Sequence, residues 1–256
     1  MPYFHRTGES TFLPTDAVGG AWDTGTQHIA PALGLLAHVI EVDRDTRRSD
    51  GLFPARLSWD IWGTVPVAEV GTSVRVLRAG RTIELVEAVL THGGRTVATL
   101  RAWLLQRTDT AGVAGTAWAA VPGPESVPAW DGTTLWPGGF IGSVDVRRRL
   151  DAPGRGLVWV RTDEELVADE PVSTLARRAG LVDVANGMTV RADPRAVAFP
   201  NVDLTVHLLR DPVGEWLGLD STVSFGPEGT GLTASVLHDE TGPLGTLAQA
   251  LTVRPA

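Results

Sequence analysis

Three polar residues in the second half of the chain, Asp183, Asn201 and Gln249, have side chains that could bind a water molecule and accept a proton from it. Asp183 stands in an apolar stretch, between Leu181-Val182 and Val184-Ala185. A carboxylate buried in such surroundings without partners is costly and tends to take up a proton instead. The two amides can donate hydrogen bonds to a carboxylate and can also bind water. We therefore predict that the three side chains form one site.

A helix followed by several strands would position these residues, and this pattern occurs once in each half of the chain. Apolar residues at helical spacing predict a helix over 27–41. Because Pro31 is tolerated only in the first turn of a helix, this helix must begin near His28. A second helix is predicted over 173–186, with Asp183 in its last turn, where the helix dipole disfavours a negative charge. Extended runs follow each helix, at 52–65, 72–78, 82–92 and 95–106 in the first half and at 199–209, 216–225, 231–238 and 244–253 in the second.

The two halves align with each other at a nearly constant offset. The helical segment 30–37 matches 176–183 at an offset of 146 residues. Later matches keep this offset to within one residue, and they pair Pro66 with Pro212 and Thr99 with Thr246. Three matches in register indicate an internal duplication. In this alignment an alanine stands opposite each residue of the predicted site, with Ala37 opposite Asp183, Ala55 opposite Asn201 and Ala102 opposite Gln249.

A helix wrapped by a long antiparallel meander, present twice, is typical of a double hotdog. This is an α+β fold in which two sheets fuse edge to edge into one continuous sheet, which hides strand edges. We predict an N-terminal hotdog over 1–107, a connector rich in proline, glycine and tryptophan over 108–139, and a C-terminal hotdog over 140–256. Because the connector contains three tryptophans, we expect it to pack on the surface of the molecule.

Composition and missing motifs exclude several classes of function. The chain of 256 residues has a formal net charge of −8, whereas general nucleic-acid binders need a positive surface. It has no cysteine, and its six histidines show no metal-binding spacing, so we predict no metal site. No Gly-x-Ser-x-Gly elbow, P-loop or dinucleotide-binding glycine motif occurs. The start lacks the apolar run of a signal peptide and no stretch is long and apolar enough to span a bilayer, so we expect a cytoplasmic protein without membrane contact.

Several short motifs in both halves are similar to those of one known family. They are WVRT at 159–162, LVD at 181–183, NVDLTVHLLRDP at 201–212, GEW at 214–216 and Gln249 in the second half, and Trp22-Asp23, Gln27-His28 and RAGR at 78–81 in the first. They resemble the acyl-CoA thioesterase II family of double-hotdog proteins, over nearly the whole chain except 108–138. In that family an Asp, a Thr or Ser, and a Gln together orient the attacking water. Asp183 and Gln249 stand at the Asp and Gln positions, and Asn201 stands on or next to the Thr position.

The resemblance implies that Asp183 acts as general base in thioester hydrolysis, with Asn201 and Gln249 fixing the water. No histidine is strictly required, because the leaving thiol is acidic, with a pKa of about 8.5 by comparison with cysteine. The carbonyl oxygen would be met by backbone N–H groups where the first helix begins, those of His28, Ile29 and Ala30.

The implied substrate is an acyl-CoA or a related thioester, so arginines are expected near its phosphates. Arg78 and Arg81 are the first candidates for this contact. The others are Arg147, Arg148, Arg149, Arg177, Arg178 and Arg210. Coenzyme A would enter only as part of the substrate, and we expect no separate cofactor. A homodimer is a possible state, because hotdog sheets often associate further.

Two other functions stay open from the sequence. Asp23 and His28, at Asp-x-x-x-x-His spacing, resemble the acid–base pair of hotdog enoyl-CoA hydratases, although no Asn-Pro lies between them. Alternatively, a double hotdog with a weakened site could bind acyl-CoA or an acyl chain without turnover. Release of free thiol from acyl-CoAs would favour the hydrolase, loss of enoyl absorbance the hydratase, and tight binding without turnover the binding protein.

Overall fold

Strands dominate the structure, which is a computed structural model describing residues 1–255. The strands of the first half are β1 (Phe4–Arg6), β2 (Thr11–Pro14), β3 (Phe53–Ile61), β4 (Val70–Arg78), β5 (Ile83–His92) and β6 (Arg95–Leu105). Those of the second half are β7 (Val144–Ala152), β8 (Arg155–Thr162), β9 (Val197–Ala198), β10 (Asp203–Leu208), β11 (Leu217–Phe225), β12 (Thr230–Asp239), β13 (Gly242–Thr252) and β14 (Arg254–Pro255). The α-helices are α1 (Ile29–Arg47), α2 (Gly139–Gly142), α3 (Thr174–Ala179) and α4 (Ala185–Met188).

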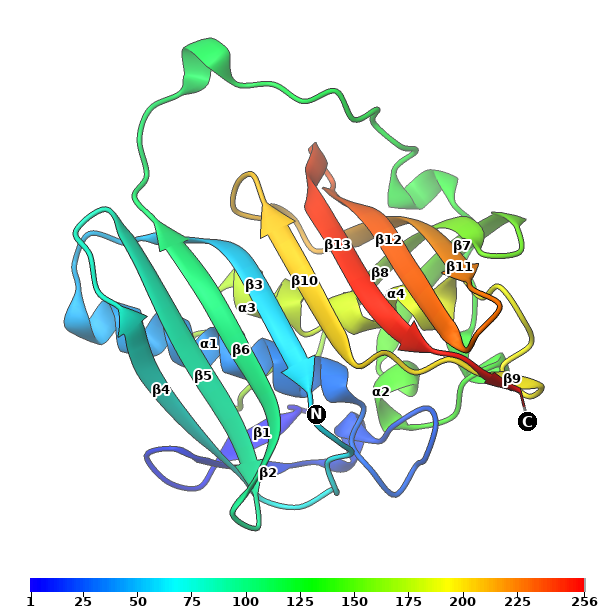
Figure 1. The fold of residues 1–256 in the computed structure, drawn as a ribbon, viewed down its shortest axis with the longest axis horizontal. Coiled ribbons are helices and arrows are strands. Elements are labelled where there is room, and N and C mark those ends of the chain that lie inside the picture. The colour runs from blue at the N-terminus through cyan, green and yellow to red at the C-terminus, as the bar shows by residue number, and fades with distance from the viewer. Residues whose placement is uncertain (256) are drawn as a thin grey trace.

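One antiparallel sheet of 12 strands spans both halves, with α1, α3 and α4 on one of its faces (Figure 1). Its strand order is β1-β2-β4-β5-β6-β3-β10-β13-β12-β11-β8-β7. The halves join where β3 pairs with β10, with Ser58 opposite Thr205, and the order runs outward in the same way on both sides. This arrangement confirms the predicted α+β double hotdog. The short strands β1 and β2, which the sequence did not indicate, are the counterparts of β7 and β8.

Helix α1 is buried along most of its length beneath the first half of the sheet. It begins at the predicted place, with His28 as its N-cap. It ends at Arg47, six residues beyond the predicted end, because Arg44 is buried and donates to the carbonyl of Leu52. None of the helices within residues 1–255 combines the length and the apolar character that crossing a membrane requires.

The second helix is interrupted, so the predicted continuous helix over 173–186 is wrong. Helix α3 ends at Ala179, a 3-10 turn follows at Val182–Val184, and α4 then begins. The interruption lies where α3 crosses α1, with Gly180 packed against Gly34. Asp183 therefore lies in the first turn of a new helical segment, and the predicted conflict with a helix C-terminus does not arise.

The contact between Gly34 and Gly180 predicts a large cost for any side chain at the crossing. A methyl group on Gly34 would lie 2.8 Å from Gly180 Cα and 2.9 Å from the carbonyl oxygen of Ala176. Gly34→Ala should therefore lower the free energy of unfolding by about 2 kcal/mol, measured by urea denaturation, despite the better helix propensity of alanine. The control is Gly142→Ala, where a methyl group would meet no atom within 4 Å. Equal stabilities of the two variants would contradict the proposed close packing.

The segment between β6 and β7 is exposed in its first part and packed against the rest of the molecule in its later part. Residues 106–120 are exposed and form a long loop that stands away from the sheet (Figure 1), so the prediction that the connector packs on the surface is wrong there. Its later part does pack. Trp136 is buried against Trp22 and Phe199, and its Nε1 donates to the carbonyl of Gly187 at 2.8 Å. The later part of the connector thus joins aromatic side chains from both halves of the chain.

Candidate active site

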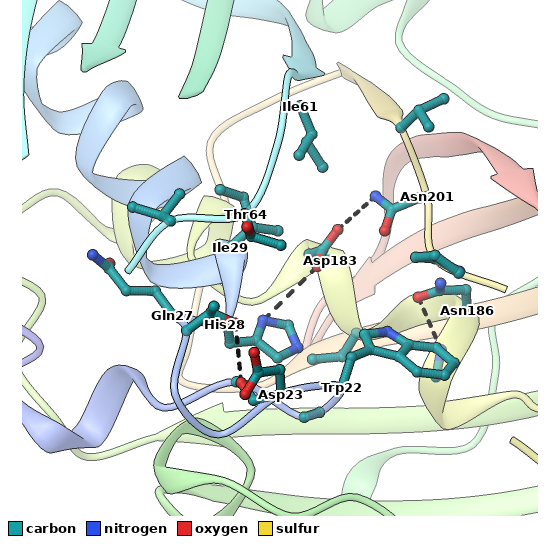
Figure 2. A pocket seen from close by; sticks show the side chains of 18 of the residues that line it. Trp22, Asp23, Gln27, His28, Ile29, Ile61, Thr64, Asp183, Asn186 and Asn201 are labelled. Carbon is teal, nitrogen blue, oxygen red and sulfur yellow. Dashed lines mark hydrogen bonds and ion pairs between the residues drawn. The ribbon is translucent and has the colours of Figure 1, made fainter. Parts of the chain in front are cut away.

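A cavity of about 370 Å³ opens between the two halves of the molecule (Figure 2). Its walls come from the loop before α1, the start of α1, the segment after β3, the turn that contains Asp183, and the segment that precedes β10. Among the lining residues are Asp183, Asn201, His28 and Ile29, so both halves of the chain contribute to it. The duplicated fold therefore brings the start of the first helix close to the polar residues of the second.

The three predicted site residues lie together. Asn201 Nδ2 donates to Asp183 Oδ1 at 2.7 Å, and Gln249 Nε2 reaches the same oxygen at 3.4 Å. Asn201 lines the cavity just before β10, as Figure 2 shows, whereas Gln249 is buried in β13 and approaches the carboxylate from the sheet. The two amides thus differ in position. Asn201 can touch a molecule in the cavity, and Gln249 holds the carboxylate.

Burial raises the pKa of the Asp183 carboxyl to about 7, and the hydrogen bonds from Asn201 and Gln249 act in the opposite direction. The cause is loss of hydration, which penalises the charged form inside the protein. A carboxylate with a pKa near neutrality is a stronger base than an exposed one, and it still exists in its ionised form under physiological conditions. These are the properties required of a general base.

His28 lies beside Asp183 but does not form an ion pair with it. The two side chains approach to 3.8 Å, between Nδ1 and Oδ2. His28 Nδ1 already accepts the backbone N–H of Ala30 at 3.2 Å, so the ring proton must be on Nε2. Burial also lowers the pKa of His28 to about 4. The ring is therefore neutral whenever Asp183 is ionised.

The backbone at the start of α1 offers one free donor where the sequence predicted three. The N–H of His28 donates to the carbonyl of Val18 at 2.7 Å, and that of Ala30 donates to the His28 ring. The Ile29 N–H has no acceptor within residues 1–255, as expected of the first residue of a helix. Ile29 lines the cavity, whereas Ala30 is fully buried and does not. Of the three predicted oxyanion donors, the geometry leaves Ile29.

Asp23 and His28 both line the cavity, but no hydrogen bond between their side chains occurs in the described structure. Asp23 Oδ1 accepts the N–H of Gly25 at 2.9 Å and closes a turn in the loop before α1. The ring nitrogen of His28 nearest to a carboxylate faces Asp183 instead. This arrangement does not favour the acid–base pair of a hydratase.

Arg78 and Arg81, the predicted phosphate contacts, lie away from the cavity. Strand β4 begins five residues after Val65, which lines the cavity, and ends at Arg78, ~26 Å further along at the usual rise per residue. Arg78 and Arg81 line no part of the cavity, and the carbonyl of Arg81 accepts a hydrogen bond from Arg48. The arginine that does line the cavity is Arg254 of β14. Within residues 1–255, no cluster of three or more potential metal ligands occurs.

Several further residues line the cavity, and one of them, Trp22, stands in a motif that resembles the family. Trp22 and Trp136 pack edge to face, with ring centroids 4.7 Å apart, and both line the cavity with the largely exposed Trp62. Thr64, in the segment after β3, adds a hydroxyl (Figure 2). These residues come from loops and from the connector, whose positions depend on packing between distant segments.

Two models of one protein family together match nearly the whole chain. Residues 18–118 match the family model of the acyl-CoA thioesterase N-terminal domain, and residues 119–253 match that of the acyl-CoA thioesterase C-terminal domain. The boundary between the two falls in the exposed loop of the connector. No curated protein matches the chain in sequence.

Solved structures share the fold at low sequence identity. A hot dog protein of unknown function from Alicyclobacillus acidocaldarius is 17% identical, with a TM-score of 0.76 over 97% of this chain and 95% of that one. The acyl-CoA thioesterase II TesB2 of Mycobacterium marinum is 14% identical, with a TM-score of 0.70 over 99% and 96%. The tesB protein of Mycobacterium avium subsp. paratuberculosis is 18% identical, with a TM-score of 0.68 over 98% and 96%.

Proposed function

The chain belongs to the acyl-CoA thioesterase family and is a thioester hydrolase, and we propose that Asp183 is the general base of its reaction. The observation that supports this role is a buried carboxylate, held by two amides, that lines a cavity shared with a helix N-terminus. The proposed substrate is an acyl-CoA. Its thioester carbonyl lies in the cavity between Asp183 and the start of α1.

In the proposed reaction a water molecule lies in the cavity, within hydrogen-bond reach of both the Asp183 carboxylate and the Asn201 amide. The water oxygen bonds to the thioester carbonyl carbon while one of its protons passes to Asp183. The carbon–sulfur bond of the tetrahedral intermediate then breaks. The departing thiolate takes up the proton that Asp183 accepted, so the products are a carboxylic acid and free coenzyme A. Gln249 keeps the carboxylate oriented throughout.

The negative charge on the carbonyl oxygen requires a donor on the side of the cavity opposite Asp183. The free N–H of Ile29, at the positive end of α1, is suited to this role. His28, whose Nε2 carries the ring proton, also lines the cavity and is a second candidate donor. Base and oxyanion donors thus come from different halves, which accounts for a carboxylate in only one of the duplicated helices.

A thiol-release assay across acyl-CoAs of different chain lengths and aryl thioesters tests the activity. Free thiol should appear with at least one substrate and require Asp183. A chain that binds acyl-CoA tightly but releases no thiol from any member of the panel would be a binding protein. Loss of enoyl absorbance from crotonyl-CoA without thiol release would identify a hydratase. Either result would overturn the proposal.

Substitution of Ile29 by proline removes the proposed oxyanion donor with little change to the backbone. Proline suits the first position of a helix, and His28 already has the extended backbone that a following proline requires. Ile29→Pro should lower kcat about 100-fold, as loss of one oxyanion donor does. The control Ile29→Ala removes the same side chain but keeps the N–H, and it should lose far less. Similar kcat values for both variants would show that the N–H has no part in catalysis.

A further inference from the structure

Two buried polar groups behind the site lack hydrogen-bond partners in the described part of the chain. They are Gln249 Oε1, on the amide that holds Asp183, and Thr233 Oγ1. Gln249 is 1% exposed and Thr233 is 0% exposed. An orphaned buried carbonyl or hydroxyl costs free energy unless a partner lies within reach.

Thr233 and Gln249 stand directly opposite each other on neighbouring strands, β12 and β13. Both side chains are buried on the inner face of the sheet. Directly opposed residues of an antiparallel pair have Cβ atoms ~5 Å apart, within reach of a hydrogen bond between a hydroxyl and an amide. Thr233 can donate its O–H, and Gln249 Oε1 can only accept.

The first half of the chain has neither group at the equivalent positions. The offset of 147 that pairs Thr246 with Thr99 also pairs Thr233 with Val86 and Gln249 with Ala102. Val86 and Ala102 stand opposite each other on β5 and β6, both fully buried. A valine–alanine pair in one half thus corresponds to a threonine–glutamine pair in the other, and the polar pair is the one beneath Asp183.

We propose that Thr233 is a positioning residue of the active site. After a small adjustment of the two facing side chains, its hydroxyl donates to Gln249 Oε1 and holds the Gln249 amide against Asp183. This inference rests on the proposed function, because it assigns Thr233 a role through Gln249 and Asp183. Fixing one end of the amide limits its rotation and keeps Nε2 directed at the carboxylate. Thr233 does not line the cavity and does not touch the substrate.

The test is steady-state kinetics of three single variants with an acyl-CoA that the wild type hydrolyses. Thr233→Val recreates the first-half residue with almost the same shape, and Thr233→Ser keeps the hydroxyl. The matched control is Ser235→Ala, which removes a buried hydroxyl two residues along the same strand, bonded only to Ser221 at 2.7 Å. Ser235→Ala also recreates the residue of the first half, Ala88.

Thr233→Val should lower kcat about tenfold, the size of one lost hydrogen bond, and leave KM within about twofold. Because the Gln249 hydrogen bond lowers the pKa of Asp183, weakening it should also move the acid limb of the rate profile to higher pH. Thr233→Ser and Ser235→Ala should leave both kcat and the position of the acid limb of the rate profile unchanged. In a Gln249→Ala background, Thr233→Val should have almost no further effect, because its partner is already absent.

Different outcomes separate this inference from the proposed function. Unchanged kcat and pH profile in Thr233→Val, or a full additional loss in the Gln249→Ala background, would overturn the role of Thr233 alone. Full activity after substitution of Asp183 would overturn the proposed function. Thermal denaturation of each variant checks its folding, and a loss of stability with unchanged kcat counts against a positioning role.

Discussion

Replacement of Asp183 by asparagine is expected to lower kcat by about three orders of magnitude, within the range usual for loss of a general base. Asparagine has nearly the same shape and can still contact Asn201 and Gln249, but its amide cannot accept the proton of the attacking water. Substrate binding should change little, because the lost interaction forms in the transition state. The measurement is thiol release under saturating acyl-CoA, together with KM.

The control for this prediction is Glu41→Gln. Glu41 is a buried carboxyl on α1 whose pKa is also raised by burial, and it does not line the cavity. It bonds to Ser173, so its substitution should alter stability without abolishing hydrolysis. An Asp183→Asn variant that folds and keeps more than about a tenth of the wild-type kcat would exclude Asp183 as the base.

Asp183 should also make the stability of the protein depend on pH. Its pKa is about 7 in the folded chain and about 4 when unfolded, so the folded state holds this proton more tightly. The resulting stabilisation is fully present below the unfolded pKa and is lost as pH rises through the folded pKa. In total it amounts to about 4 kcal/mol, of which about 2 to 3 kcal/mol is lost between about pH 5 and pH 8.

The difference in unfolding free energy between the wild type and Asp183→Asn isolates this effect. Other groups whose pKa values shift on folding, including His28, are present in both proteins and largely cancel. Urea denaturation at several pH values should show the wild type losing stability relative to Asp183→Asn as pH rises. A difference that stays constant with pH would mean that the carboxylate is hydrated in the folded protein.

Most of the fold could be predicted from the sequence, because the same order of a helix and four strands occurs in both halves of the chain. The start of α1, the four strands after it and the fused sheet follow from local periodicity and from Pro31. The break after Ala179 did not, because it depends on the crossing of two helices at Gly34 and Gly180. A contact between residues 146 positions apart leaves no periodic signal in either helix.

The site was predictable to the extent that the two halves differ. The Asp183 cluster appeared as polar residues opposite alanines, and the same alignment contains the Val86–Thr233 difference. The arginines were not predictable, because which end of a strand lies at the cavity depends on the assembled sheet. Arg78 ends β4 on the far side, while Arg254 reaches the cavity through β14.

The pH dependence of kcat/KM for a hydrolysed acyl-CoA tests the role of Asp183 most directly. The profile should rise with an apparent pKa of about 7 and then level, because only ionised Asp183 can accept the proton of water. Titration of His28 does not contribute to this rise, because its pKa is about 4. A profile that stays flat through neutrality, or the same rise in the Asp183→Asn variant, would contradict the account.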